Sequence, residues 1–172
     1  MRSIWVLIAM AILVVSGCKG KDNTSVYSTP GGQVKVEKKG NGDVKELTVT
    51  SEKGTVTFRT GKGEIPEDLG VPIYPGADAE EGRTWSMKGM NKGKEGGVSS
   101  TFLHSDDGIE KVIAFYKKEL KGRTPKFFEM TSPNGRMANF AIDTDAPVSI
   151  NIMIAESPDK KGTQVHITRI QK

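Results

Sequence analysis

Alternation of apolar and polar residues predicts strands along much of this chain. The clearest run covers 148–154, where the apolar positions are Val148, Ile150, Ile152 and Ile154. Successive side chains of a strand point to opposite faces, so this period of two predicts a strand with one buried face. Similar runs separated by turn residues predict further strands over 84–87, 98–103, 126–131, 137–142 and 165–170.

Residues 33–63 are predicted to form a small three-stranded β-meander. Val34 and Val36 open it, and Asn41 and Gly42 supply a turn because both residues tolerate positive φ. The strands share one apolar face that continues to Phe58. Three thin strands need a partner for stability, so we expect this face to pack on another part of the chain or on another protein.

One long helix is predicted after the fifth strand. Its apolar residues recur at helical spacing, at Ile109, Val112, Ile113, Tyr116 and Leu120. Ser105–Asp107 are expected to open it, with Asp107 as the N-cap, and Lys121-Gly122 to end it. The expected fold class is therefore α+β: an antiparallel sheet covered by one main helix over 64–172, preceded by the meander.

Two connecting segments leave alternatives open. Ile65–Gly70 is expected to form a helical turn, and 71–76 an extended connector that packs Ile73 and Tyr74 into the core. The alternative is a binding edge with Tyr74 exposed. The Gly- and Lys-rich stretch 88–97 is expected to be a mobile hairpin tip. Its alternative role is contact with anionic lipid or glycan through Lys88, Lys92 and Lys94.

The first eighteen residues have the layout of a secretory signal. A positive start at Arg2 is followed by an unbroken apolar run, 4–15, and then by the small residues Ser16 and Gly17. The run is too short to cross a bilayer comfortably, since a helix needs about 20 residues for that.

The end of this segment, Val15-Ser16-Gly17-Cys18, resembles the lipobox of bacterial lipoproteins. The resemblance implies that Cys18 carries diacylglycerol and that cleavage occurs between Gly17 and Cys18. Residues 1–17 are then the signal peptide, and 18–32 are expected to form a flexible tether. The implied location is the cell membrane or the outer membrane, with the body facing the periplasm or the cell exterior.

A second resemblance covers the body. Pro72–Ala77, followed by Val112–Leu120, looks like a pattern in uncharacterised bacterial secreted proteins. It implies a small α+β domain and assigns no catalytic residue.

Composition excludes several classes of function. A formal net charge of +4 over 172 residues lacks the dense basic stripe of a nucleic-acid binder. A single Cys excludes an internal disulfide framework, and two His leave little material for a zinc site. We expect no metal, no cofactor and no nucleic-acid partner.

Candidate catalytic groups are few. His104 lies beside Ser105, Asp106 and Asp107, but capping of the helix uses the same residues without any reaction. His166 is expected to face solvent. The carboxylate pairs lie in polar loops, where we expect them to be solvated, with a weak Ca²⁺ site as the alternative: Glu80-Glu81 and Asp143/Asp145.

The sequence therefore predicts a non-enzymatic, lipid-anchored envelope protein that binds or supports another envelope component. Its expected contacts are the membrane, through lipid on Cys18, and an envelope protein. The alternatives are a membrane-anchored hydrolase or small-ligand-binding protein of unknown substrate, and a purely structural spacer.

Overall fold

The computed structural model describes residues 23–61, 65–66, 69–79, 84–91, 94–133, 135–158 and 161–172. The strands are β1 Thr24–Thr29, β2 Gly32–Lys38, β3 Val44–Ser51, β4 Gly54–Gly61, β5 Asp78–Ala79, β6 Thr84–Asn91, β7 Lys94–Ser105, β8 Lys126–Ser132, β9 Gly135–Ile142, β10 Val148–Glu156 and β11 Thr163–Gln171. The helices are α1 Ile109–Glu119 and the short 3-10 helix η1 Lys121–Arg123.

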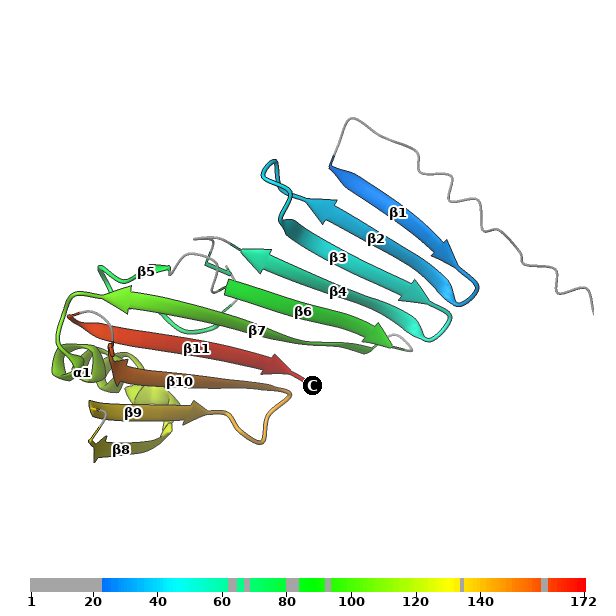
Figure 1. Ribbon diagram of the computed structural model, residues 1–172. Helices are drawn as coiled ribbons and strands as arrows, with labels where there is room; N and C mark the ends of the chain where they lie inside the picture. Colours follow the sequence, from blue (N-terminus) through cyan, green and yellow to red (C-terminus); the bar gives the residue numbers. More distant parts are fainter. Residues whose placement is uncertain are drawn as a thin grey trace, which may run out of the picture.

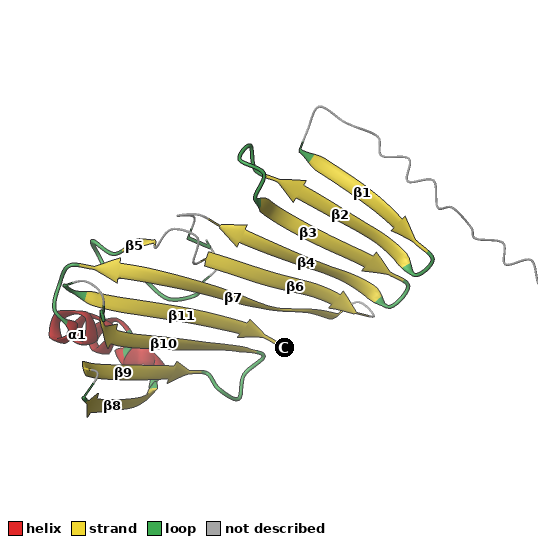
Figure 2. Cartoon of the chain, in the orientation of Figure 1, coloured by secondary structure: helices red, strands yellow, loops and turns green. Residues whose placement is uncertain are grey.

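All the strands belong to one antiparallel sheet (Figure 1). Its order is β1-β2-β3-β4-β6-β7-β11-β10-β9-β8, and β5 pairs with β7 beside this path. The expected α+β fold is wrong, because the described chain is mostly β with a single α-helix (Figure 2). The meander strands exist as β2, β3 and β4, but β4 continues the ladder by pairing with β6.

The stretch expected as a hairpin tip explains part of this difference. β6 runs on to Asn91 and β7 already begins at Lys94, so most of 88–97 is strand. Gly89 pairs with Gly96, and the backbone of β6 thereby satisfies its hydrogen bonds with β7. The glycine content of 88–97 indicated a loop. The backbone N–H and C=O groups of β6 need hydrogen-bond partners, however, and β7 supplies them.

The helix covers one end of the sheet. The core residues of the strands beneath it point to the same face and are Leu103, Ala138, Phe140, Ile142, Ile150, Ile152, Ile154, Val165 and Ile167. α1 packs on β9 and β10 with the apolar face that its sequence predicted. The alternation along β10 is likewise confirmed, since Ile152 and Ile154 are fully buried.

α1 begins two residues after the predicted cap. Gly108 is the N-cap, and no side chain caps the helix. The Asp107 carboxylate instead accepts hydrogen bonds from Lys111 Nζ at 2.8 Å and from the Tyr74 hydroxyl at 2.7 Å. These two bonds hold the pKa of Asp107 below its usual value. Asp107 therefore ties the connector to the helix and leaves the helix backbone uncapped.

The connector before β6 packs on the core, as its sequence predicted. Tyr74 is 8% exposed, and its ring meets Phe115 edge-to-face at 5.3 Å. Ile73 is partly buried against the same core. The alternative of an exposed Tyr74 is wrong. Of the expected helical turn, Ile65, Pro66, Leu69 and Gly70 are not helical, and 67–68 lie outside the described residues.

The apolar side of the sheet changes face along β7. Leu103 is fully buried on the face that α1 covers. Val98 lies five positions earlier and therefore points to the opposite face. Small polar residues that are almost fully buried lie between them, at Ser99, Ser100 and Thr101. α1 consequently covers only part of the sheet, and β1 to β4 and β6 extend beyond it (Figure 1).

Part of the segment expected to be a tether is a strand. β1 pairs with β2 over its whole length, from Thr24 opposite Glu37 to Thr29 opposite Gly32. Thr, Val and Tyr favour a pleated strand, and Gly32 supports the intervening turn with a φ of 146°. The expectation of a flexible tether was wrong for 24–29. The polar composition of this segment indicated a tether, but pairing with β2 stabilises it as a short strand.

Candidate functional site

The most prominent surface feature is an apolar face on the strands that α1 does not cover. It consists of two rows of side chains that run across neighbouring strands on one side of the sheet. We call it the open apolar face, and its members are Tyr27, Val34, Val36, Leu47, Val49, Val56, Phe58, Trp85, Met87, Val98 and Ile170.

Strand register places these residues in line. In the first row, Tyr27 lies opposite Val34, and the row continues through Val49 and Val56. In the second row, Val36 opens a series that runs through Leu47, Phe58, Met87, Val98 and Ile170. Trp85 stacks near Phe58, with 6.3 Å between ring centroids. Such cross-strand neighbours stabilise a sheet, but they leave its outer surface uncovered.

The exposure of these side chains shows that no described segment covers them. Tyr27 is 47% exposed, Val49 41%, Val56 45% and Met87 43%. In a folded soluble domain, a contiguous apolar patch of this extent marks an interaction surface. The open apolar face is therefore the best candidate functional site among the described residues.

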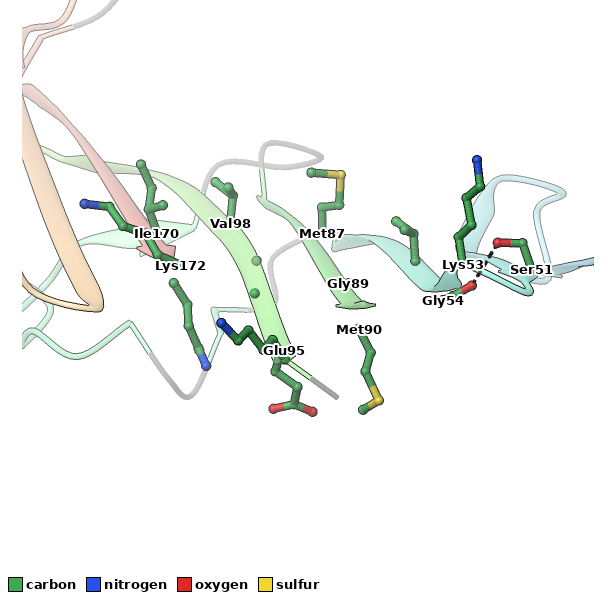
Figure 3. Close-up of a pocket in the computed structure, with 15 residues that line it drawn as sticks. Ser51, Lys53, Gly54, Met87, Gly89, Met90, Glu95, Val98, Ile170 and Lys172 are labelled. Carbon is green, nitrogen blue, oxygen red and sulfur yellow. Dashed lines mark hydrogen bonds between the residues drawn. The ribbon is translucent and has the colours of Figure 1, made fainter. Parts of the chain in front are cut away.

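The first row ends in a hollow rather than in side chains. Beyond Val56 it continues with Gly89 and Gly96, which face each other across β6 and β7. The hollow measures about 620 Å³, and Met87, Val98 and Ile170 are among its apolar walls. Figure 3 shows Lys53, Met87, Val98 and Ile170 on one side of the strands and Met90 and Glu95 on the other. A recess therefore lies at one end of the face, and Tyr27 projects at the other.

The opposite face of the same strands is mainly polar, with Val26, Val44 and Met90 as exposed apolar exceptions. Arg59 Nε donates to Glu46 Oε2 at 2.5 Å, and this contact lowers the pKa of Glu46. Thr48 and Thr57 share a hydrogen bond at 3.2 Å beside this pair. The continuous apolar rows therefore lie on one side of the open strands, and the ion pair and the Thr hydrogen bond lie on the other.

The candidate binding residues named from sequence do not form one site. Tyr74 is buried in the core. Lys88 lines a separate hollow of about 400 Å³ on the polar face, whereas Lys94 lies at the rim of the hollow in the open apolar face. Lys92 lies outside the described residues, as do Gly17 and Cys18.

The residues around His104 do not form a catalytic triad. Nε2 of His104 lies 3.5 Å from Asp106 Oδ1. Ser105 is 3% exposed, and its hydroxyl accepts the backbone N–H of Asp107 at 3.2 Å. Asp107 is bound to Tyr74 and Lys111, as described above. Because neighbouring strand residues point to opposite faces, His104 and Ser105 diverge.

A second serine–histidine pair was not foreseen from the sequence. Ser100 Oγ lies 2.7 Å from His166 Nε2, and Thr168 Oγ1 lies 3.2 Å from the same nitrogen. The His166 ring stacks on Phe102 with 3.9 Å between centroids. Ser100 is only 1% exposed, so a substrate cannot reach its hydroxyl. The prediction that His166 faces solvent is wrong, since it is about half buried and burial lowers its pKa.

The carboxylate pairs named from sequence are described only in part. Asp143 pairs with Arg123 at 2.5 Å, and Asp145 accepts a hydrogen bond from Thr144; Glu80 and Glu81 lie outside the described residues. Within the described ranges, no group of three or more His, Cys, Asp or Glu residues could hold a metal ion. No helix in that part of the chain is long and apolar enough to cross a membrane.

Comparison with protein-family models, with curated proteins and with solved structures found no match to this chain. The assignment of the functional site therefore depends only on the geometry of the structure. Sequence reasoning found the apolar face of the meander but missed its continuation through Trp85, Met87, Val98 and Ile170. The signal that could have found it is the alternation on both sides of 88–97, read as continuing strands.

Proposed function

We propose that this chain is a non-enzymatic, lipid-anchored protein of the cell envelope whose open apolar face binds or supports another envelope component. The observation that carries the proposal is the uncovered double row of apolar side chains on β1 to β4, β6, β7 and β11. Leaving such a surface in water is unfavourable by roughly 25 cal/mol for each Å² of apolar area. A partner that covers it gains this free energy.

The anchor proposed at Cys18 would hold this surface close to a membrane. β1 begins at Thr24, a short distance along the chain from Cys18. Fully extended, the chain between them reaches at most about 20 Å. One acyl chain alone binds a membrane only marginally, whereas two or more anchor stably. The edge strand β1 would then lie near the bilayer, on the cell membrane or outer membrane, with the body in the periplasm or outside the cell.

The proposal of a binding role rather than catalysis is supported by the two serine–histidine neighbourhoods. Catalysis by a serine needs an accessible hydroxyl beside its base. Ser100 lies beside His166 but is buried, and Ser105 is also buried and points away from His104. We therefore assign no catalytic residue.

The test compares two substitutions on adjacent positions of β3. Val49 belongs to the open apolar face, and Thr50 is exposed on the polar face. The full-length chain is extracted from membranes in mild detergent, and the size of its complex is measured on native gels. Val49→Asp should shift the protein from a larger complex to the single chain, whereas Thr50→Asp should migrate as wild type. A wild-type protein that is already a single chain would overturn the binding proposal.

The anchor is tested separately with Cys18→Ala. Labelled fatty acid should enter the wild-type chain and not this variant, and the variant should accumulate as an unprocessed precursor. Equal labelling of both proteins would refute the anchor.

A further inference from the structure

We propose that the molecule on the open apolar face is a second copy of this chain, packed face to face across a two-fold axis. This inference rests on the proposed function, because it names the partner of the same surface. It follows from the size and the chemistry of the two rows and from the order of residues in the first row.

The size of the face suits a dimer. The rows cross neighbouring strands from β1 to β11. At the usual strand spacing this is roughly 30 Å across the strands. Along the strands the two rows lie about 7 Å apart, and the width of their side chains extends this to about 15 Å, a footprint of about 450 Å². Two copies would bury about 900 Å² from this footprint, just below the size at which specific interfaces begin. Flanking side chains would add to it.

The chemistry of the face is that of an interface core. Neither row contains a charged residue, so two copies can approach without repulsion between like charges at the centre. Tyr27, Phe58, Trp85 and Met87 supply the aromatic and Met side chains that are enriched in such cores. The charged residues around the hollow are Lys53, Lys94, Glu95 and Lys172, outside the two rows, where water can solvate them.

The order of residues in the first row makes the face complementary to itself. The row reads, strand by strand, Tyr27, Val34, Val49, Val56, Gly89 and Gly96. A two-fold axis parallel to the strands, between β3 and β4, reverses this order in the second copy. Tyr27 of one copy then lies over Gly96 of the other, Val34 over Gly89, and Val49 over Val56. Tyr27 and Val34 of each copy thus meet the glycine recess of the other, and Val49 and Val56 pack on each other at the axis, in the reciprocal contacts of an isologous interface.

Two sheets packed in this way form a sandwich. Packed sheets lie about 10 Å apart, and their strands align within about 30°. The polar faces with Glu46 and Arg59 would point outward to water. Each dimer would also carry two anchors, which strengthens attachment to the membrane without a new contact.

The test uses single cysteines in the full-length chain, on its native membrane. Cys18 is the only cysteine of the chain, so the wild type reports any background from that thiol. A bismaleimide whose reach matches the ~10 Å spacing of packed sheets should join two Val49→Cys chains. Thr50→Cys, exposed on the opposite face of the same strand, is the matched control. We expect at least about tenfold more product of twice the monomer mass from Val49→Cys.

A third variant tests the recess. A Cβ added at Gly89 would lie 3.7 Å from Val56 Cγ2, an ordinary contact that the single chain can accept. Gly89→Leu would fill the recess, and in the Val49→Cys background it should reduce the crosslinked dimer to the level of Thr50→Cys. Circular dichroism of the same samples checks that the sheet is retained.

The outcomes separate this inference from the proposed function. Equal crosslinking at positions 49 and 50, or only monomer at both, would overturn the dimer. An adduct of Val49→Cys with a different protein would also overturn it, while leaving the binding role of the face intact. Labelling of Cys18 with fatty acid is unaffected by any of these results.

Discussion

At the scale of single residues, His166 shows how burial sets the chemistry of this sheet. Its ring lies on Phe102, and its Nε2 lies within hydrogen-bonding distance of the hydroxyls of Ser100 and Thr168. Burial lowers the pKa of His166 and favours the neutral ring.

This burial predicts a dependence of stability on pH. The pKa of His166 is about 6.5 in the unfolded chain, and burial makes it lower in the folded chain. Between the two values the unfolded state binds more protons, so the free energy of unfolding should fall as pH drops below about 6.5 and level off below the folded pKa. Denaturant titrations of wild type and His166→Gln between neutral and mildly acidic pH measure the difference. Identical pH slopes for the two proteins would show that His166 is not buried as described.

Residue-level prediction from sequence succeeded where local pattern decides and failed where tertiary contacts decide. The buried face of α1 followed from spacing alone, and Ile109, Val112, Ile113 and Tyr116 are buried as expected. Asp107 was expected to cap the helix, but Tyr74, distant in sequence, competes for its carboxylate. His166 was placed in solvent because Phe102 and Ser100 come from a different strand.

At the scale of elements, the strands under α1 and the strands beyond it are stabilised by different interactions. β10 packs its apolar residues beneath the helix, whereas β3 relies on its hydrogen bonds and cross-strand neighbours. β1 likewise exists because β2 offers an edge to pair with. Sequence pattern found β2 to β4 and β8 to β11. It missed β1 and the full lengths of β6 and β7, because Gly and polar residues interrupt the alternation there.

This difference predicts unequal costs for similar truncations. Ile152→Ala on β10 should lower the free energy of unfolding by about 2–5 kcal/mol, because it opens a cavity in a closed core. Val49→Ala on β3 should cost less than about 1 kcal/mol in the dissociated chain, because its side chain is already 41% exposed. Chemical denaturation at low protein concentration measures both. Equal losses would mean that β3 is covered within the single chain.

At the scale of the whole molecule, the sheet has two apolar sides on opposite faces. One is closed by α1, and the other is open. The expectation that the meander would pack on another part of the chain is not met within the described residues, which leaves a second molecule as its partner in the proposed function. Sequence could predict that a partner was needed, but not that the ladder would continue through β6 and enlarge the face.

The central claim is that the open apolar face is covered in the native membrane. Its most direct measurement is the rate of maleimide labelling of Val49→Cys and Thr50→Cys, in intact membranes and after dilution into dissociating detergent. A cover that excludes water should slow labelling of Val49→Cys by about tenfold or more in membranes and not in detergent, while Thr50→Cys labels at one rate in both. Equally fast labelling of the two positions in membranes would contradict the account.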